Sequence, residues 1–482
     1  MKNKKVQIIS LIVLIFQFLI SFKNLDLNYL WYVNIDEWAF HGSILRIYQG
    51  ISSLDLKIFF GTGFFNYGHL FFLINSFFSY PFYLMGITEG IVLVPRIISS
   101  ISSIISIIYL YKIFIHNKEK YLFPIFLILS FPSFWINSTI FHPDWPYACF
   151  IIISIYYLLK DNWDFGFNFK LSCLLFAISF SLKLQSITFT PIFLLYIIVS
   201  KKNKIDLLKH GLFFSVILIG LRIITNPYLL HPEGLNAFVD GFLWDMSSNK
   251  TNHYSGTTVS ILDKIQMINK YYLSYISILT ISILTMLVSF KKKLTRMTVI
   301  LLFTFILNIG YLIIFVNKSW QHYYLVPFIL LVIILNSIIS EVKNRYVFSS
   351  IIIISQISLI INFLMVYEKP DTLLLEKEVN KVSMWIENEI DINDSILVYG
   401  SISVNMDYLN INYQNIHRVY GELNQDHFFK YNNHYPGKSV RKKIFIVNKN
   451  HYFFDKIKDV LPNNYTLFRE DKNILIFKID QS

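Results

Sequence analysis

Residues 91–111 read IVLVPRIISSISSIISIIYLY, and Arg96 is the only charged side chain in this run. A helix rises about 1.5 Å per residue, so an apolar run of this length can cross the hydrocarbon of a bilayer. Similar runs recur from Val6 to Met365, and the 482-residue chain is 54% hydrophobic and only 15% charged. This composition excludes a soluble protein of this size and indicates an integral membrane protein built from helices.

The chain carries a net charge of +12. Most of the Lys and Arg residues outside the C-terminal region stand in short clusters between apolar runs, a pattern of membrane topology and not of nucleic-acid binding. The only cysteines, Cys149 and Cys173, lie inside apolar runs, so we expect neither a disulfide framework nor a thiolate metal cluster. The sequence has no Gly-rich nucleotide loop, which argues against nucleotide hydrolysis.

Six cationic clusters define the expected topology: the N-terminus, then 112–120, 160–170, 201–209, 291–296 and 343–345. If all face the cytoplasm, the chain obeys the positive-inside rule with a retained first span and an extracytoplasmic C-terminus. Residues 67–85 are long enough to span but would invert this alternation, so we expect them to lie along the outer interface as a juxtamembrane helix. The eleven predicted spans are 6–22, 91–111, 121–139, 146–160, 171–184, 186–200, 208–227, 271–290, 297–316, 322–340 and 347–366.

From about Lys369 the chain becomes rich in charged residues and Asn. Residues 373–389 have helical periodicity, with Leu375, Val379, Val382 and Ile386 on one face. Short β-type runs follow at 395–399, 443–447, 465–468 and 474–479. The chain is therefore expected to contain a transmembrane domain, 1–366, and a small extracytoplasmic α/β domain, 367–482.

Asp36 and Glu37 follow the first span and open an expected interfacial helix. Carboxylates are stabilised near a helix N-terminus. Neighbouring residues on a helix diverge by about 100°, so the two acids are expected to differ in role, one facing a reacting group and the other anchoring the loop. The alternative is that both are solvated acids that cap the helix.

The second external loop contains His142, Pro143 and Asp144 between two apolar runs. A carboxylate near hydrocarbon costs up to about 2.5–3.5 kcal/mol unless it is paired or hydrated, which makes Asp144 a candidate functional residue. Its alternative role is a helix cap, because Pro146 can begin the next span.

Isolated cations stand near the expected outer ends of three spans: Arg96, Lys183 and Arg222. An anionic phosphate would satisfy them, although such side chains also reach the interface without a ligand. His322 and Tyr323 begin the tenth span at the same face, where an aromatic belt is the alternative explanation.

These residues, in this order, resemble the GT-C superfamily of integral membrane glycosyltransferases, particularly the protein O-mannosyltransferase-like group that includes the lipid A aminoarabinose transferase. The likeness rests on the early acidic pair, the apolar interfacial helix, Pro95-Arg96, the acid in the second external loop, Lys183, and the entry from His322 to Pro327. Members of the group often have a Lys-Pro-Pro-like turn before the interfacial helix. This chain has Tyr67-Gly68-His69-Leu70 there.

The resemblance implies transfer of a sugar from a polyprenyl-phosphate donor to a lipid, polysaccharide or protein acceptor at the outer face of the cell membrane. Asp36 would be the general base of an inverting reaction, with Glu37 and Asp144 as further catalytic acids. Donor and acceptor contacts would come from Arg96, Lys183, Arg222, His142, His322 and Tyr323. Some members use a divalent metal ion, which Asp36, Glu37, His142 and Asp144 could bind, but no cofactor is required by the pattern.

Two other functions remain open. A transporter or flippase of lipid-linked sugars would also carry intramembrane cations, but transporters tend to show inverted repeats and broken helices, which the sequence does not reveal. A polysaccharide polymerase, also with many spans, would rest its catalysis more on Arg-rich external loops than on an early acidic pair. Residues 226–270 form a long external loop, and its candidate side chains are His231, Glu233, Asp240 and Asp245.

Overall fold

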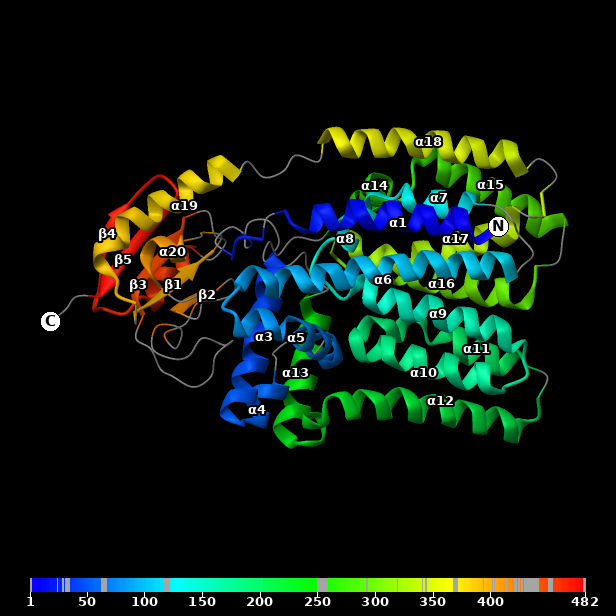
Figure 1. Ribbon diagram of the computed structural model, residues 1–482, viewed down its shortest axis with the longest axis horizontal. Coiled ribbons are helices and arrows are strands. Elements are labelled where there is room, and N and C mark those ends of the chain that lie inside the picture. The colour runs from blue at the N-terminus through cyan, green and yellow to red at the C-terminus, as the bar shows by residue number, and fades with distance from the viewer. Residues whose placement is uncertain are drawn as a thin grey trace.

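The computed structural model has two parts, a helical bundle and a sheet domain at one end of it (Figure 1). It describes residues 2–479 except 24, 28–29, 31–34, 62–66, 117–121, 201, 249–258, 292–293, 319, 340, 343–344, 367–371, 393, 401, 403, 412–414, 420–422, 424, 426–427, 429–441 and 450–453. The chain's N-terminus lies at the end of the bundle away from the sheet domain (Figure 1).

The long helices of the bundle run side by side (Figure 1). They are α1 (Lys2–Ser21), α6 (Thr88–His116), α9 (Asp144–Asp161), α10 (Phe167–Leu182), α12 (Lys204–Thr225), α15 (Tyr275–Lys291), α16 (Arg296–Ile314), α17 (Leu325–Ile339) and α18 (Arg345–Val366).

Two of the predicted spans are broken in the middle. Residues 121–139 form α7 (Phe123–Leu129) and α8 (Pro132–Ser138), and residues 186–200 form the 3₁₀ turn η1 (Leu184–Phe189) and α11 (Pro191–Val199). In each case a proline begins the second piece, because a residue without an N–H suits the first turn of a helix but not its interior.

Five helices are long and apolar enough to cross a membrane: α1, α6, α12, α16, and the unit formed by η4 (Gln321–Tyr324) and α17. Four shorter apolar segments accompany them, at Phe167–Leu182, Leu184–Val199, Tyr275–Met286 and Tyr346–Ile361. The polytopic helical class is confirmed, and every predicted span coincides with a helix or a broken helix. The figure of eleven crossings remains a prediction.

The outside of the bundle is suited to lipid. Helix α12 exposes a row of apolar side chains at intervals of three and four residues: Leu208 (72%), Leu212 (62%), Val216 (59%) and Ile219 (57%). A contiguous apolar row of this kind is unfavourable in water and favourable against acyl chains. By contrast, α17 is enclosed by its neighbours, with nearly all of its side chains buried.

Other helices lie crosswise at the end of the bundle that carries the sheet domain (Figure 1). They include α3 (Ile35–Ser53), α4 (Leu56–Phe60) and α13 (Pro232–Ser248), and α5 (His69–Leu84) packs against α3 and α6. Helix α5 covers most of the 67–85 segment and is not among the five helices long and apolar enough to span. The interfacial position of this segment remains a prediction.

The C-terminal part is a five-stranded sheet with strand order β2-β1-β3-β5-β4. Strands β2 (Ile416–Val419), β1 (Ser395–Tyr399) and β3 (Lys442–Asn448) are parallel, while β5 (Ile474–Ile479) and β4 (Tyr465–Glu470) are antiparallel to their neighbours. The predicted α/β domain and four of its strands are confirmed. The sequence of β2 does not signal a strand, because two polar residues separate its apolar ends.

Helix α19 (Thr372–Ile386), followed by the turn η5 (Glu387–Glu389), buries Val379, Val382 and Ile386, as the periodicity predicts. The side chain of Leu375 lies outside the described residues. The apolar cluster under this helix continues into the membrane part through Leu27, Leu30, Trp38 and Val92. The sheet domain is therefore packed against the first residues of α3, directly beside the acidic pair.

We expect Trp38→Ala to destabilise this junction by about 3–5 kcal/mol, because it empties a site that is 95% buried between the two parts. Limited proteolysis of the full chain in nanodiscs should then release the sheet domain faster than in the unmodified protein. Leu56→Ala is the control, since Leu56 is 69% exposed on α4. Equal cleavage rates in all three proteins would contradict the role given to Trp38.

Candidate active site

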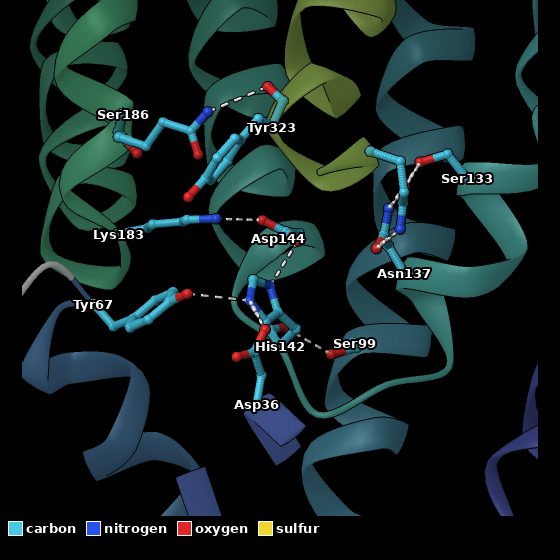
Figure 2. Close-up of polar contacts among 12 residues, drawn as sticks. Asp36, Tyr67, Ser99, Ser133, Asn137, His142, Asp144, Lys183, Ser186 and Tyr323 are labelled. Atoms are coloured by element: carbon cyan, nitrogen blue, oxygen red, sulfur yellow. Dashed lines mark hydrogen bonds and ion pairs between the residues drawn. The ribbon is translucent and has the colours of Figure 1, made fainter. Parts of the chain in front are cut away.

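Residues from five separate segments meet where the crosswise helices cover the bundle (Figure 2). Asp36 comes from the start of α3, Tyr67 from the residues before α5, and Lys183 from the junction of α10 and η1. The loop between α8 and α9 contributes His142 and Asp144, and η4 contributes Tyr323 and His322. No two of these segments are neighbours in the sequence, so the site is a product of tertiary packing.

Asp144 is wholly buried and binds two cationic or potentially cationic partners. Its Oδ1 accepts a 2.6 Å hydrogen bond from Lys183 Nζ, and its Oδ2 lies 2.6 Å from His142 Nδ1 (Figure 2). Removing one partner of such a pair leaves an uncompensated buried charge, which typically costs about 3–5 kcal/mol. The pairing explains how a carboxylate is tolerated at the start of an apolar helix.

Aromatic rings enclose the ammonium group of Lys183. Nζ lies 5.6 Å from the ring centroid of Tyr67, 5.3 Å from that of Tyr147 and 5.7 Å from that of Tyr323. Each ring face attracts the cation, so the charge is stabilised although the Lys183 side chain is only 5% exposed. Tyr67 and Tyr147 were not predicted as site residues, because single tyrosines in an aromatic-rich chain carry no signal.

His142 stands between the two acids of the site. Its Nδ1 faces Asp144, and its Nε2 lies 3.8 Å from Asp36 Oδ2 and 3.5 Å from the Tyr67 hydroxyl oxygen (Figure 2). Ser99 Oγ on α6 donates a 3.1 Å hydrogen bond to the His142 carbonyl, which fixes the backbone. His142 is therefore held in one orientation, with a carboxylate beside each ring nitrogen.

Glu37 points away from this cluster and pairs with Arg96. Glu37 Oε1 accepts from Arg96 Nε at 2.7 Å and from the Phe141 N–H at 2.5 Å, and Oε2 accepts from Arg96 Nη2 at 2.5 Å. Arg96 Nη1 also donates to the carbonyls of Ser21 and Lys23 at 3.0 and 2.6 Å. This bidentate pair ties the start of α3 to α1, α6 and the loop before α9.

Asp36 keeps 37% of its side chain accessible, whereas Glu37 is buried. Loss of water around the carboxyl raises the pKa of Asp36, and the charges of His142 and Lys183 offset part of this rise. The negative charges of Asp144 and Glu37 act in the same direction as burial. The site thus holds one reachable carboxylate whose basicity exceeds that of an ordinary aspartate.

The turn at Tyr67-Gly68 holds Lys183 in place. Tyr67 pairs with Lys183 in an isolated antiparallel bridge, and the Gly68 N–H donates a 2.9 Å hydrogen bond to the Leu182 carbonyl. A Cβ at position 68 would lie 1.5 Å from the Ser181 carbonyl oxygen, so only glycine permits this approach. This contact explains the glycine at position 68.

Arg222 lies behind this turn and binds backbone. Its Nη1 donates to the carbonyls of Phe180 at 3.0 Å and Ser181 at 3.4 Å, near the end of α10. These carbonyls have no partner within the helix, so the guanidinium caps the helix end that presents Lys183. Arg222 is thus a neighbour of the site that acts on the end of α10.

A buried polar network positions η4, which carries His322 and Tyr323. Gln321 bonds Asn137 and Ser133 through its side chain, with Gln321 Nε2 to Asn137 Oδ1 at 3.0 Å and Ser133 Oγ to Gln321 Oε1 at 2.5 Å. The Tyr272 hydroxyl donates a 2.5 Å hydrogen bond to the Gln321 carbonyl. His322 is thereby placed with its ring centroid 4.9 Å from that of His142.

The predicted residues therefore separate into three groups. Glu37 and Arg96 form an ion pair, and Arg222 caps a helix. One cluster contains the remaining residues: Asp36, His142, Asp144, Lys183, His322 and Tyr323.

Among the predicted metal ligands, Glu37 has both oxygens engaged by Arg96. The described residues whose ligand atoms converge are His142, Asp144 and His322.

The side chains expected from the 226–270 loop lie elsewhere. Glu233 pairs with Lys57 at 2.6 Å and accepts from the Tyr228 hydroxyl at 3.0 Å, all three on crosswise elements that include η2 (Pro227–Leu230). His231 and Asp240 are exposed, and the side chain of Asp245 lies outside the described residues.

Comparison with known families supports the resemblance. Residues 70–230 match the family model described as dolichyl-phosphate-mannose-protein mannosyltransferase. The matched region runs from α5 to the turn after α12 and contains Arg96, His142, Asp144, Lys183 and Arg222. No curated protein matches this chain.

The chain shares its fold with ArnT, in agreement with the resemblance to the GT-C superfamily. The crystal structure of ArnT from Cupriavidus metallidurans bound to undecaprenyl phosphate superposes with a TM-score of 0.61 at 11% identity, covering 98% of each chain. The apo structure of the same protein gives 0.59 at 10% identity, covering 91% of this chain and 92% of that one. These matches confirm the resemblance to the protein O-mannosyltransferase and aminoarabinose transferase group.

We expect Gly68→Ala to lower the free energy of unfolding by about 1–3 kcal/mol, because the added methyl group overlaps the backbone carbonyl of Ser181. The unfolding midpoint in nanodiscs measures this. Gly211→Ala on α12 is the control, since a Cβ there meets nothing within 4 Å. A midpoint for Gly68→Ala equal to that of Gly211→Ala would show that the turn does not need glycine.

Proposed function

We propose that this protein transfers a sugar from a polyprenyl-phosphate donor to an acceptor at the outer face of the cell membrane. The observation that carries the proposal is one accessible carboxylate, Asp36, beside the buried cluster of Lys183, Asp144 and His142. Two further findings support it: the family model is one for mannosyltransferases that use a dolichyl-phosphate sugar, and the solved ArnT of the same fold was crystallised with undecaprenyl phosphate.

In this proposal Asp36 is the general base. The acceptor hydroxyl loses its proton to the Asp36 carboxylate while its oxygen forms a bond to the anomeric carbon, and the bond from that carbon to the phosphate oxygen breaks. A positioned base of this kind contributes about 10²–10⁴-fold in rate. The direct displacement would invert the anomeric centre, because among the described residues the other two carboxylates at the site, Glu37 and Asp144, are engaged by Arg96, Lys183 and His142.

Lys183 is assigned to the donor phosphate. An ammonium group has three donors, and Asp144 takes one of them. A phosphate next to Nζ would be bound in a site with little water, where its charge is stabilised as the polyprenyl phosphate leaves. Arg96 is less suited to this task, because Glu37 and two carbonyls already occupy its Nε, Nη1 and Nη2.

The remaining residues are assigned to positioning and orientation. Glu37 and Arg96 hold the first turn of α3, and with it Asp36, against the bundle. Asp144, His142, His322 and Tyr323 orient Lys183 and the substrate hydroxyls around it. Should a divalent metal ion bind, His142, Asp144 and His322 are the residues that would hold it, and it would supply a positive charge to the oxygens of the reactants.

The orientation we propose has the N-terminus in the cytoplasm and the sheet domain outside. The site and the sheet domain lie at the same end of the bundle, opposite to the N-terminus (Figure 1). This arrangement agrees with the positive-inside assignment of the cationic loops. It also agrees with an acceptor that arrives from outside the cell membrane.

We expect Asp36→Asn to reduce sugar transfer by about 10²–10⁴-fold while the protein remains folded, because the amide cannot accept the acceptor's proton. The assay supplies polyprenyl-phosphate sugars to membranes that contain the protein and follows the label into lipid, polysaccharide and protein by mass spectrometry. Asp240→Asn, an exposed acid on α13, is the matched control and should retain full transfer. Full transfer by Asp36→Asn would refute the assigned base. Movement of intact lipid-linked sugar between leaflets, with no transfer, would favour a flippase.

The rate should also report the raised pKa of Asp36. Only the deprotonated carboxylate accepts a proton, so kcat/KM falls as the pH drops through this pKa. Because burial raises the pKa of Asp36, the acid limb should lie above about pH 3.9, the ordinary value for an aspartate. A profile of kcat/KM from pH 4 to 8 measures it. A rate that stays constant down to pH 4 would contradict the raised pKa.

A further inference from the structure

Three metal-ligating side chains from two distant loops converge beside Lys183. His142 and Asp144 come from the loop before α9, and His322 comes from η4. One ligand atom from each lies within 4.8 Å of the other two. Two ligand atoms that each lie about 2.1 Å from one shared ion are at most about 4.2 Å from each other. Small side-chain rotations would bring the three ligand atoms within that distance.

One nitrogen of this cluster is buried without a partner. His142 Nδ1 and Asp144 Oδ2 pair with each other at 2.6 Å. Among the described residues, His322 Nε2 is a buried atom with no hydrogen-bond partner. Buried polar atoms are normally satisfied, so an unsatisfied imidazole nitrogen beside this pair indicates a missing partner.

Asp144 and His142 have partners on their opposite sides, and the backbone next to His322 is held in place. Asp144 Oδ1 accepts from Lys183, and His142 Nε2 faces the carboxylate of Asp36 at 3.8 Å. The loop that carries His322 is fixed through the hydrogen bond from the Tyr272 hydroxyl to the Gln321 carbonyl. A carboxylate behind a histidine ligand, as Asp36 lies behind His142, is typical of metal sites, where it sets the orientation and tautomer of that ligand.

We propose that His142, Asp144 and His322 bind one first-row divalent metal ion. Two imidazoles and one carboxylate form a ligand set that suits Zn²⁺ and its neighbours and does not suit Mg²⁺ or Ca²⁺, which prefer oxygen ligands. Three protein ligands also leave one position for water or a substrate oxygen. The proposal does not depend on the proposed sugar transfer, because binding can be measured without any substrate.

The charges of the cluster favour a cation. Asp36 and Asp144 are two acids in contact with the site, and Lys183 is the cation paired with one of them. The nearby Glu37 is neutralised by Arg96. A divalent ion would therefore lie near two carboxylates and one ammonium group. The ammonium group of Lys183 contacts Asp144 Oδ1, the oxygen that would not bind the ion.

The test uses the full chain without a polyhistidine tag, reconstituted in nanodiscs and stripped with EDTA. One equivalent of Zn²⁺ is added, weakly bound metal is removed with a low-affinity chelator, and retained zinc is measured by mass spectrometry. We expect about one zinc per chain in the unmodified protein and at least about tenfold less in His322→Gln and in Asp144→Asn. His231→Gln should retain the zinc, because His231 is an exposed histidine outside the cluster.

X-ray absorption of the zinc-loaded unmodified protein keeps the test independent of how the variants fold. The proposal expects scattering from two imidazole rings and at least one oxygen ligand. It is overturned if the unmodified protein retains no zinc, if folded His322→Gln retains as much as the unmodified protein, or if the spectrum lacks two imidazoles. A zinc-bound protein without sugar transfer would leave this site in place and count against the proposed function alone.

Discussion

The buried ion pair between Asp144 and Lys183 organises the end of the bundle. Neither charge would be stable alone among apolar side chains, so each makes the position of the other obligatory. The pair joins the start of α9 to the end of α10, and three tyrosine rings close around its ammonium group. The tight turn at Gly68 follows from the same requirement, because the chain before α5 must pass close to Lys183.

The ion pair between Glu37 and Arg96 gives the adjacent acids Asp36 and Glu37 different surroundings. Glu37 and Arg96 satisfy one another completely enough that Glu37 has no free oxygen for chemistry. Since neighbouring residues on a helix diverge by about 100°, fixing Glu37 against the bundle turns Asp36 toward the open side of the site. The buried acid, Glu37, therefore determines where Asp36, the proposed general base, points.

The sheet domain shares this anchorage. Trp38 follows the acidic pair and belongs to the apolar cluster that runs under α19 and the sheet. The first turn of α3 is thus held on one side by an ion pair within the bundle and on another by apolar contacts with the sheet domain. The domain contributes to the site through packing, although none of the charged residues of the cluster in Figure 2 comes from it.

Much of the architecture follows from the sequence. Apolar runs bounded by cationic clusters predict helices correctly at each expected span, and alternation predicts four of the five strands. Pro132 and Pro191 indicate the two helix breaks locally. The long apolar runs around them nevertheless led to a prediction of unbroken spans. Strand β2 had none, because its pairing with β1 supplies the hydrogen bonds that its polar residues do not suggest.

By itself the sequence determined which residues are costly to place near a membrane, and so it singled out Asp36, Asp144, Lys183 and Arg96. It could not determine their partners, because a charge in an apolar run requires some counter-charge without specifying which one. Only the tertiary structure decided that Arg96 meets Glu37 while Lys183 meets Asp144, and that His322 lies beside His142. Those contacts join helices far apart in the chain, and they depend on how the helices pack around one another.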